Sequence, residues 1–235
     1  MTRALLLSLL FSSTSSLLHA QTPGDWVHSR GNEAMTGFSP TVLKFPLQPA
    51  WQFKMMEKPK GQGEMLVSSP VVRGGKVYAG CKDGKFFCLE LATGKELWKA
   101  EAKGAFDGAA AFAGELVVAG CQDGFVYAWN ADTGKEAWKF ETDAEIHAAA
   151  NVWTDPETKT EHIIIGSYDY NVYSLNAKTG AKEWAAETGY YINGGAAVGD
   201  GKVVFGGCDS VLHVHDVKTG KVRNPLMFQR LEERI

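Results

Sequence analysis

The sequence lacks a strong charge imbalance, a membrane-length apolar run beyond its N-terminus and any abundance of proline, with only 8 prolines among 235 residues. A formal net charge of −3 gives no electrostatic reason to expect a nucleic acid or an anionic lipid surface as the partner. No later segment is apolar over the length that a transmembrane helix needs, so we expect no transmembrane segment. The content of 45% hydrophobic and 22% charged residues is typical of a globular protein rather than a disordered one.

The sequence also lacks the compact motifs of several enzyme classes. It has no nucleophile elbow, phosphate-binding loop or metalloprotease helix. Neither the CxxC spacing of zinc sites nor the CxxCH spacing of haem attachment occurs among its cysteines, which are Cys81, Cys88, Cys121 and Cys208. If Asp83-Gly84 is a two-residue hairpin turn, Cys81 faces Phe86 and lies on the opposite sheet face from Cys88. We therefore expect free, partly buried thiols, and their redox state stays open.

Residues 1–20 differ from the rest of the chain. Arg3 provides a short positive start, Ala4 to Phe11 is an apolar run, and Leu18 to Ala20 resembles a cleavage site. This pattern predicts a secretory signal peptide that is cleaved after about Ala20, with a retained membrane anchor as the alternative. We therefore expect a periplasmic or secreted protein, in a compartment where thiols can oxidise.

One short segment recurs four times in the remaining chain. Its copies run from Cys88 to Trp98, from Ala128 to Trp138, from Ser174 to Trp184 and from Val214 to Asn224. The turn glycines in these copies fall roughly 40 residues apart, with a polar insert around Asp155 to Thr160 in the third unit. In the first two units the copy is preceded by two β-rich runs that flank an Asp-Gly turn, which is a strong hairpin signal.

One unit therefore supplies four short strands. In the second unit we expect them at residues 109–113, 115–120, 125–130 and 135–142. A four-stranded unit of about 40 residues that repeats is typical of a propeller blade, and no long amphipathic stretch favours helices. The prediction is an all-β fold, a β-propeller of four-stranded antiparallel blades. About four blades lie in this chain, either as a whole propeller or as part of a seven- or eight-bladed one.

The repeated segment resembles the tryptophan-docking repeat of β-propellers of the pyrroloquinoline quinone (PQQ) type. The resemblance rests on the A-x-N-x-x-T-G-K-E-x-W pattern and covers roughly Gly24 to Arg223. This family includes quinoprotein alcohol and glucose dehydrogenases and the propeller lipoprotein of the outer-membrane β-barrel assembly machinery. The repeat predicts packing between blades by Trp51, Trp98, Trp138 and Trp184, and turns at Gly94, Gly134, Gly180 and Gly220.

Both ends of the repeat region depart from the pattern. The fourth unit has Asn224 where the others have Trp, residues 226–235 follow no blade pattern, and residues 48–53 resemble an outer strand without a blade. Either the strand around Trp51 closes a four-bladed ring, or the chain is part of a larger propeller, which we favour. An open arc exposes sheet faces and edges, which a homodimer would cover. The expected divisions are a signal peptide 1–20, an N-terminal segment 21–66, propeller repeats 67–223 and an atypical tail 224–235.

When the four units are aligned, one equivalent position falls at the start of each innermost strand. In the four units this position holds Val67, Asp107, His147 and Asn193. Equivalent positions of successive blades surround the propeller axis, so we expect the three polar side chains to gather at one channel mouth. Tyr190 and Tyr191 are expected to form an aromatic wall nearby. In quinoproteins this region holds the quinone and its calcium, and Asp and Asn oxygens suit that cation; the alternative is a set of ordinary polar residues at a solvated entrance.

Several other polar residues receive structural interpretations. His213 and His215 point to one face of a strand without a third ligand nearby, so we expect exposed or edge histidines rather than a metal site. Cys81 and Cys121 occupy equivalent repeat positions, which favours packing within the blade over a redox role. Hairpin-turn chemistry explains the repeated Asp83, Asp123, Asp169 and Asp209.

The expected function follows from the resemblance and from what the chain lacks. Quinoprotein dehydrogenases have adjacent cysteines that stack on the quinone and an acidic metal-binding set, and this chain matches neither. We therefore expect a non-enzymatic propeller that needs no cofactor and serves as a scaffold for protein partners in the cell envelope. The alternatives are a PQQ- and calcium-dependent alcohol or sugar dehydrogenase, or a fragment of one, and a carbohydrate-binding propeller that uses Tyr190 and Tyr191. No nucleic-acid partner is expected.

Overall fold

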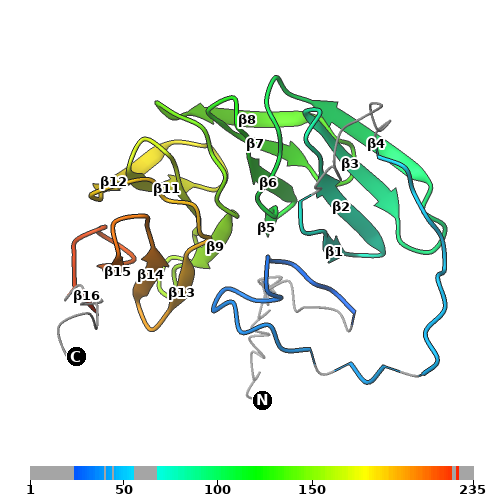
Figure 1. The fold of residues 1–235 in the computed structure, drawn as a ribbon, viewed down its shortest axis with the longest axis horizontal. Helices are drawn as coiled ribbons and strands as arrows, with labels where there is room; N and C mark the ends of the chain where they lie inside the picture. Colours follow the sequence, from blue (N-terminus) through cyan, green and yellow to red (C-terminus); the bar gives the residue numbers. More distant parts are fainter. Residues whose placement is uncertain (1–23, 40, 44, 56–67, 224–225, 228–235) are drawn as a thin grey trace, which may run out of the picture.

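The computed structural model describes residues 24–39, 41–43, 45–55, 68–223 and 226–227. Four antiparallel four-stranded sheets follow one another around an arc, and the N-terminal segment runs across its open side (Figure 1). The predicted β-propeller architecture is thereby confirmed. The predicted signal peptide, Val67 and Asn224 lie outside the described residues. Over the described ranges, no helix is long and apolar enough to cross a membrane.

Each sheet is a blade whose strands follow in chain order from the inside outward. The first blade comprises β1 (Val71–Arg73), β2 (Lys76–Gly80), β3 (Lys85–Glu90) and β4 (Glu96–Glu101). The second comprises β5 (Ala111–Ala113), β6 (Leu116–Gly120), β7 (Phe125–Asn130) and β8 (Glu136–Glu141). The third comprises β9 (Asn151–Thr154), β10 (Glu161–Gly166), β11 (Asn171–Asn176) and β12 (Lys182–Glu187). The fourth comprises β13 (Ala197–Gly199), β14 (Lys202–Gly206), β15 (Val211–Asp216) and β16 (Leu226–Met227).

The hairpin between β2 and β3 corrects the predicted register. Gly80, rather than Cys81, pairs with Phe86. The loop is closed by a hydrogen bond from Cys81 N to Lys85 O of 3.0 Å, and Gly84 takes a positive φ of 81°. The two-residue turn was wrong because the left-handed residue adds one position to the loop, as in three-residue hairpins. All four cysteines are nevertheless free thiols, as predicted.

The tryptophans of the outer strands β4, β8 and β12 dock on the following blade. Trp98 Nε1 donates a hydrogen bond of 2.9 Å to Ala131 O, and its ring covers Gly134. A Cβ atom at Gly134 would lie 2.7 Å from the ring, and the φ of this residue is 71°, so only glycine suits the position. The same geometry joins Trp51 to Leu91 and Gly94, Trp138 to Ala177 and Gly180, and Trp184 to Val217 and Gly220.

A second glycine contact fixes the connectors between blades. A Cβ atom at Gly80, the last residue of β2, would lie 2.2 Å from the Cβ of Phe106, in the connector to the next blade. Gly120 meets Ile146 and Gly166 meets Ile192 in the same way, at 2.2 and 2.3 Å. Phe106, Ile146 and Ile192 are buried. Because these apolar side chains are locked in place, the residue that follows each of them has a defined position.

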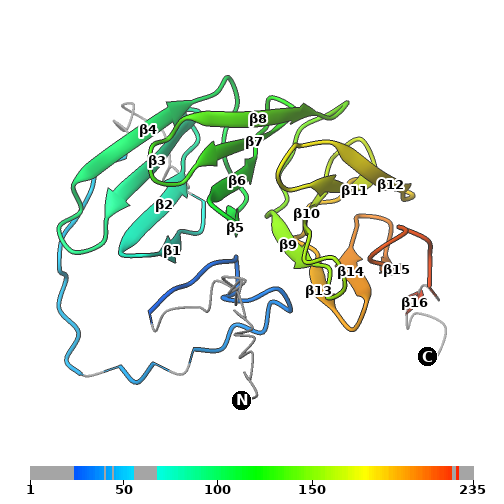
Figure 2. The same cartoon turned by 180° about the vertical axis from the view of Figure 1, so that it is seen from behind.

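Residues 24–37, the crossing segment, link the first blade to the third and fourth. Trp26 exchanges two backbone hydrogen bonds of 2.8 Å with Val72 of β1. Further along, Glu33 O accepts hydrogen bonds from Val198 N at 2.9 Å and from Asn151 Nδ2 at 2.8 Å. The crossing segment thus satisfies inner-edge backbone groups of both ends of the arc, which water would otherwise solvate. Figure 2 shows the same crossing from behind.

The arc does not close into a four-bladed ring through Trp51. Residues 48–53 form no strand, and β15 pairs instead with β16, which extends the fourth blade into the region expected as an atypical tail. The forward face of the fourth blade, which is the face that points away from the third blade, is partly exposed. Val204, Leu212 and Val214 on this face are half-buried, whereas the equivalent residues of the second blade, Val118, Val126 and Ala128, are buried. Among the described residues, nothing lies within 4 Å of a Cβ placed at Gly206.

His28 makes the crossing segment sensitive to acid. Its side chain is 5% exposed, and burial lowers its pKa to about 4 from the ordinary 6.5. The unfolded chain takes up the proton as the pH falls through 6.5, whereas the folded chain does not until about pH 4. Stability is therefore lost across this window. We expect a loss of about 2 kcal/mol between pH 7 and pH 5 that is specific to His28.

Chemical denaturation of the wild type and the variant His28→Gln at both pH values measures this loss. The variant should lose less unfolding free energy than the wild type on acidification. Equal losses in the two proteins would show that His28 is not the sensitive group.

Candidate functional site

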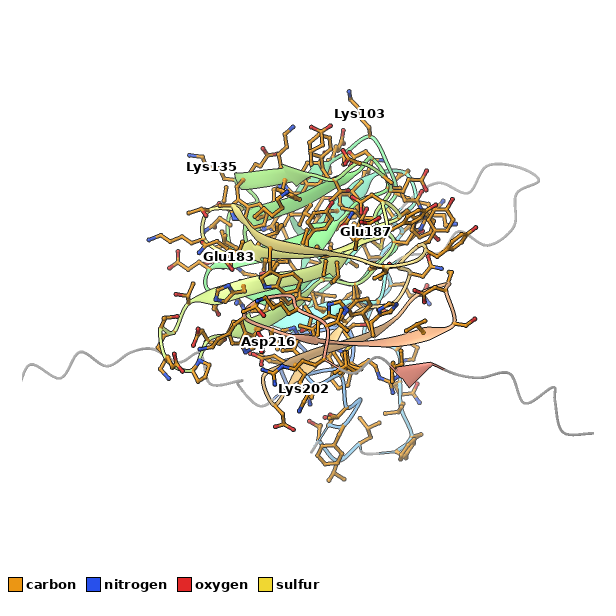
Figure 3. All side chains as sticks on the ribbon, turned by 90° about the vertical axis from the view of Figure 1, so that its left-hand side faces the viewer. Lys103, Lys135, Glu183, Glu187, Lys202 and Asp216 are labelled. Carbon is orange, nitrogen blue, oxygen red and sulfur yellow. The ribbon has the colours of Figure 1, made fainter. Side chains whose placement is uncertain are left out.

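The connectors between blades lie at the same end as the β2–β3 hairpin of the first blade and the equivalent hairpins β6–β7, β10–β11 and β14–β15, and we call it the connector end. Because the four strands of a blade alternate in direction, the Thr-Gly turns lie at the opposite end. Along β12, Glu183 lies toward the same end as Lys135 and Asp216, and Glu187 lies toward the other (Figure 3). All the sequence-predicted mouth residues are in connectors and therefore lie at the connector end.

The three predicted mouth residues follow the locked apolar side chains of the connectors. Asp107 and His147 come together, with 3.1 Å between Asp107 Oδ2 and His147 Nδ1. His147 Nε2 lies 2.9 Å from Glu145 Oε2 in the same connector. Asn193 is separate from this pair, and its Nδ2 donates to Cys208 Sγ at 3.2 Å. The predicted set is thus only partly brought together.

A second set of side chains, which sequence reasoning missed, links the first. Gln122 Nε2 donates to Asp107 Oδ2 at 2.5 Å and lies 3.3 Å from His147 Nδ1. Tyr168 packs against His147 at an interplanar angle of 33° with ring centroids 4.3 Å apart, and it shares a side-chain hydrogen bond with Asn193. Hairpin and connector residues therefore alternate along the arc, in the order Asp107, Gln122, His147, Tyr168, Asn193 and Cys208. The available signal was the repeat itself, because Gln122, Tyr168 and Cys208 each precede a turn aspartate.

The turn aspartates hold the hairpins against the connectors. Asp123 accepts hydrogen bonds from Phe125 N within the turn, from Lys103 N of the connector and from Tyr127 Oη at 2.8 Å. Asp169 makes the equivalent set with Asn171 N, Asp143 N and Tyr173 Oη. These carboxylates are occupied by backbone donors, which agrees with the structural role that turn chemistry predicts.

Four tyrosines form a continuous aromatic surface beside His147, which we call the tyrosine ledge: Tyr168, Tyr170, Tyr190 and Tyr191. Tyr191 lies 4.7 Å from Tyr168, 5.2 Å from Tyr170 and 4.6 Å from Tyr190 between ring centroids. Tyr170 and Tyr190 stack nearly parallel at 5.7 Å. Tyr190 is 45% exposed, so the ledge is accessible to a partner. The predicted aromatic wall of Tyr190 and Tyr191 is half of this surface.

Tyr170 occupies a strained backbone position. Its φ is 73°, at the turn position where the first two blades have Gly84 and Gly124. A bulky residue in this left-handed region costs on the order of 1–3 kcal/mol. Strain of this kind is retained where the surrounding structure or a function requires the side chain.

The connector end of the second to fourth blades is acidic. Its connectors and hairpins, residues 104–107, 120–124, 142–147, 166–171, 188–194 and 206–210, contain neither Lys nor Arg. They contain the carboxylates Asp107, Asp123, Asp143, Glu145, Asp169 and Asp209. Lys103 borders the first of these ranges. An acidic surface with exposed aromatic rings favours cationic over anionic ligands.

Three of the four thiols are buried within the blades. Burial raises the pKa of Cys81 and Cys88 to about 11 and that of Cys121 to about 12. Cys81 Sγ donates to Asp83 Oδ1, and Cys121 Sγ donates to Gly104 O at 3.1 Å. These groups therefore behave as packing and hydrogen-bonding residues. Cys208 is the exposed thiol.

The histidines of β15 differ from the expectation that they are exposed. His213 and His215 are 9% and 1% exposed. His213 Nε2 bonds to Asp209 Oδ2 at 2.7 Å, in the position where Tyr127 and Tyr173 bond to their turn aspartates. His215 Nδ1 lies 2.9 Å from Gly220 O, and burial lowers its pKa. We expected exposed or edge histidines, and exposure was wrong because the alternation of β15 places both rings on the sheet face where they pack against Phe205.

A PQQ–calcium site, which the resemblance offers, does not fit these residues. Asp107 Oδ2, a candidate oxygen for calcium, accepts from Gln122 and lies 3.1 Å from His147 Nδ1. Asn193 is separate from Asp107, and its Nδ2 donates to Cys208. No cluster of three or more His, Cys, Asp or Glu side chains in the described ranges could hold a metal. The acidic connector end would also repel the carboxylates of the quinone.

The chain matches a family model described as outer membrane protein assembly factor BamB, over residues 47–106 and 87–230. The outer membrane protein assembly factor BamB of Nitrosomonas eutropha is 32% identical over 69 residues. This match covers 29% of the chain and 16% of that protein, so only a small part of the relative's length is represented.

Solved structures show the same fold at lower identity. BamB from Moraxella catarrhalis superposes with a TM-score of 0.57 and 21% identity, over 65% of this chain and 49% of that one. A europium-containing methanol dehydrogenase gives 0.56 and 15%, over 68% and 41%. The computationally designed protein Ika4 gives 0.56 and 19%, over 69% of this chain and 99% of the design. The chain thus spans about half of the natural structures that it resembles.

The burial of the thiols yields a reactivity prediction. At pH 8 a thiol-specific reagent such as DTNB should modify Cys208 quickly and leave the other three cysteines intact, because they are both buried and rarely ionised. All four should react in denaturant. Absorbance at the start of the reaction measures the count, and the variant Cys208→Ser should abolish the fast phase. Fast modification of two or more thiols in the folded protein would contradict this description of the blade cores.

Proposed function

Because the chain belongs to the PQQ-repeat propeller family described as outer membrane protein assembly factor BamB, we propose that it is a non-enzymatic scaffold that binds other proteins of the cell envelope. The proposed contact surface is the connector end. At this end one repeat position holds Asp107, His147 and Asn193 in successive connectors, on a frame that the docked tryptophans hold in place. A binding surface on loops supported by a rigid frame is a common arrangement in repeat proteins.

The observation that carries this proposal is how the polar groups at the connector end are used. Asp107, Gln122 and His147 bond to one another across two blades. The arrangement tethers neighbouring blades and directs no pair of groups toward a common reacting atom. In addition, burial raises the pKa of three thiols well above neutrality. These features favour recognition over catalysis.

Export of the protein is part of the proposal. Residues 1–20 have the positive start, the apolar run and a terminal Ala20 that together favour a signal peptide, although Leu18 is larger than the usual residue near a cleavage site. An envelope location also agrees with the family, which is described as an outer membrane protein assembly factor. The homodimer considered above belongs to the same proposal, because the forward face of the fourth blade is partly exposed.

Photo-crosslinking in cells that export the chain tests the proposal. A benzophenone amino acid replaces Tyr190 or Lys103 at the connector end, and Lys135 at the opposite end in the control. We expect crosslinks to envelope proteins from Tyr190 and Lys103 that are several-fold more abundant than those from Lys135. Crosslinks from the Lys135 position alone, or from none of the three, would contradict the proposed surface.

A calorimetric titration of the purified chain with PQQ, with and without calcium, tests the enzymatic alternative. We expect no saturable binding by the folded protein. Calcium-dependent saturation that weakens in Asp107→Ala or Asn193→Ala would overturn the scaffold proposal in favour of a quinoprotein.

A further inference from the structure

We propose that the tyrosine ledge binds an extended, arginine-bearing segment of a partner protein. The inference rests on the proposed function, because it names the chemistry of the partner at the connector end. The first observation is the strained backbone of Tyr170, in the β10–β11 hairpin of the third blade. Tyr170 holds a φ of 73° where Gly84 and Gly124 hold 81° and 88°. Since glycine suits this turn in two other blades, the fold alone does not call for a tyrosine.

The ring of Tyr170 enlarges an exposed aromatic surface rather than a core. It stacks on Tyr190, which is itself 45% exposed, and meets Tyr191 edge-on at 5.2 Å. Tyr168 then continues the row to His147, with ring centroids 4.3 Å apart. The surface is therefore elongated, with a ring every 4 to 6 Å. An extended peptide places the side chains of one face about 6.6 Å apart, so several of them can reach successive rings.

The charges beside the ledge select the ligand. Glu145 is 57% exposed on its side chain and lies against His147 at the end of the row. Asp143 is exposed in the same connector, and no Lys or Arg occurs in the connectors and hairpins of this region. A guanidinium group can stack flat on a tyrosine ring and still bond to a carboxylate in its plane. A neutral sugar gains nothing from these carboxylates, and an anionic ligand is repelled by them.

Fluorescence anisotropy with a labelled ten-residue arginine–proline repeat peptide tests the proposal. Lysine–proline and glutamate–proline peptides of equal length serve as controls, and chitohexaose competes in a further arm. We expect saturable binding of the arginine peptide, weaker binding of the lysine peptide and none of the glutamate peptide. The affinity should fall as the salt concentration rises from about 50 mM to about 300 mM. Equal binding of all three peptides, or displacement by chitohexaose, would overturn the assignment.

Substitutions distinguish a role of the tyrosine rings in binding from a role in folding. Tyr190→Leu should weaken binding by about 3- to 30-fold, as loss of one cation–π contact implies, whereas Tyr190→Phe should stay within about twofold of wild type. Glu145→Gln should weaken binding and flatten its salt dependence. If Tyr190→Leu binds as the wild type does, the ledge is not the site.

The variant Tyr170→Gly gives the most specific test, because it removes one ring of the ledge and at the same time removes the backbone strain at this position. The variant should bind several-fold more weakly, while its melting temperature is no lower than that of the wild type. Ser210 has a φ of 62° at the equivalent turn of the fourth blade, so Ser210→Gly is the matched control and should leave binding unchanged. Unchanged peptide binding in Tyr170→Gly would contradict the proposal. Peptide binding without crosslinks in cells would overturn only the proposed function, and crosslinks without peptide binding only this inference.

Discussion

The docking of a tryptophan on the left-handed glycine of the next blade is the interaction on which the rest of this structure depends. Each contact combines a ring packed on a backbone that has no Cβ with an indole hydrogen bond to a nearby carbonyl, at 2.8 to 3.1 Å in all four cases. A single four-stranded blade cannot bury both of its faces, so neighbouring blades must supply the core. The tryptophan sets the outer spacing between blades, and the apolar connector residue on the second glycine sets the inner spacing.

This spacing determines what the connector end can do. Phe106 and Ile146 pack on glycines of the preceding hairpins and thereby position the residues that follow them, Asp107 and His147. The network of Asp107, Gln122 and His147 is a consequence of that repeat and not of any local motif. The hairpins at this end differ between blades, and the third blade has Tyr170 where the first two have glycine. A regular frame with one strained, exposed aromatic surface is the physical basis for assigning recognition to this end.

The repeat predicted the frame well and the site in part. Trp98, Gly134 and their equivalents were visible because they recur at the blade period, and Asp107, His147 and Asn193 because they share one offset. Gln122 and Tyr168 were missed because contact between blades depends on side-chain length and direction, which the spacing of residues does not contain. The predicted turn at Gly84 was one residue too short. An Asp-Gly pair occurs both in two-residue turns and in three-residue loops that end on a left-handed glycine, so the sequence does not distinguish them. His213 was expected at the surface because the sequence alone does not show which face of β15 is covered.

The most direct test of this account compares two alanine substitutions at left-handed glycines. Gly74 has a φ of 58° with nothing within 4 Å of an added Cβ, whereas a Cβ at Gly134 would lie 2.7 Å from the ring of Trp98. Denaturant unfolding of both variants separates backbone strain from docking. The account predicts a loss of about 1–2 kcal/mol for Gly74→Ala, from strain alone. Gly134→Ala should lose at least about 1–3 kcal/mol more, from displacement of the tryptophan. Equal losses at the two positions would contradict the claim that docking on this glycine holds the blades together.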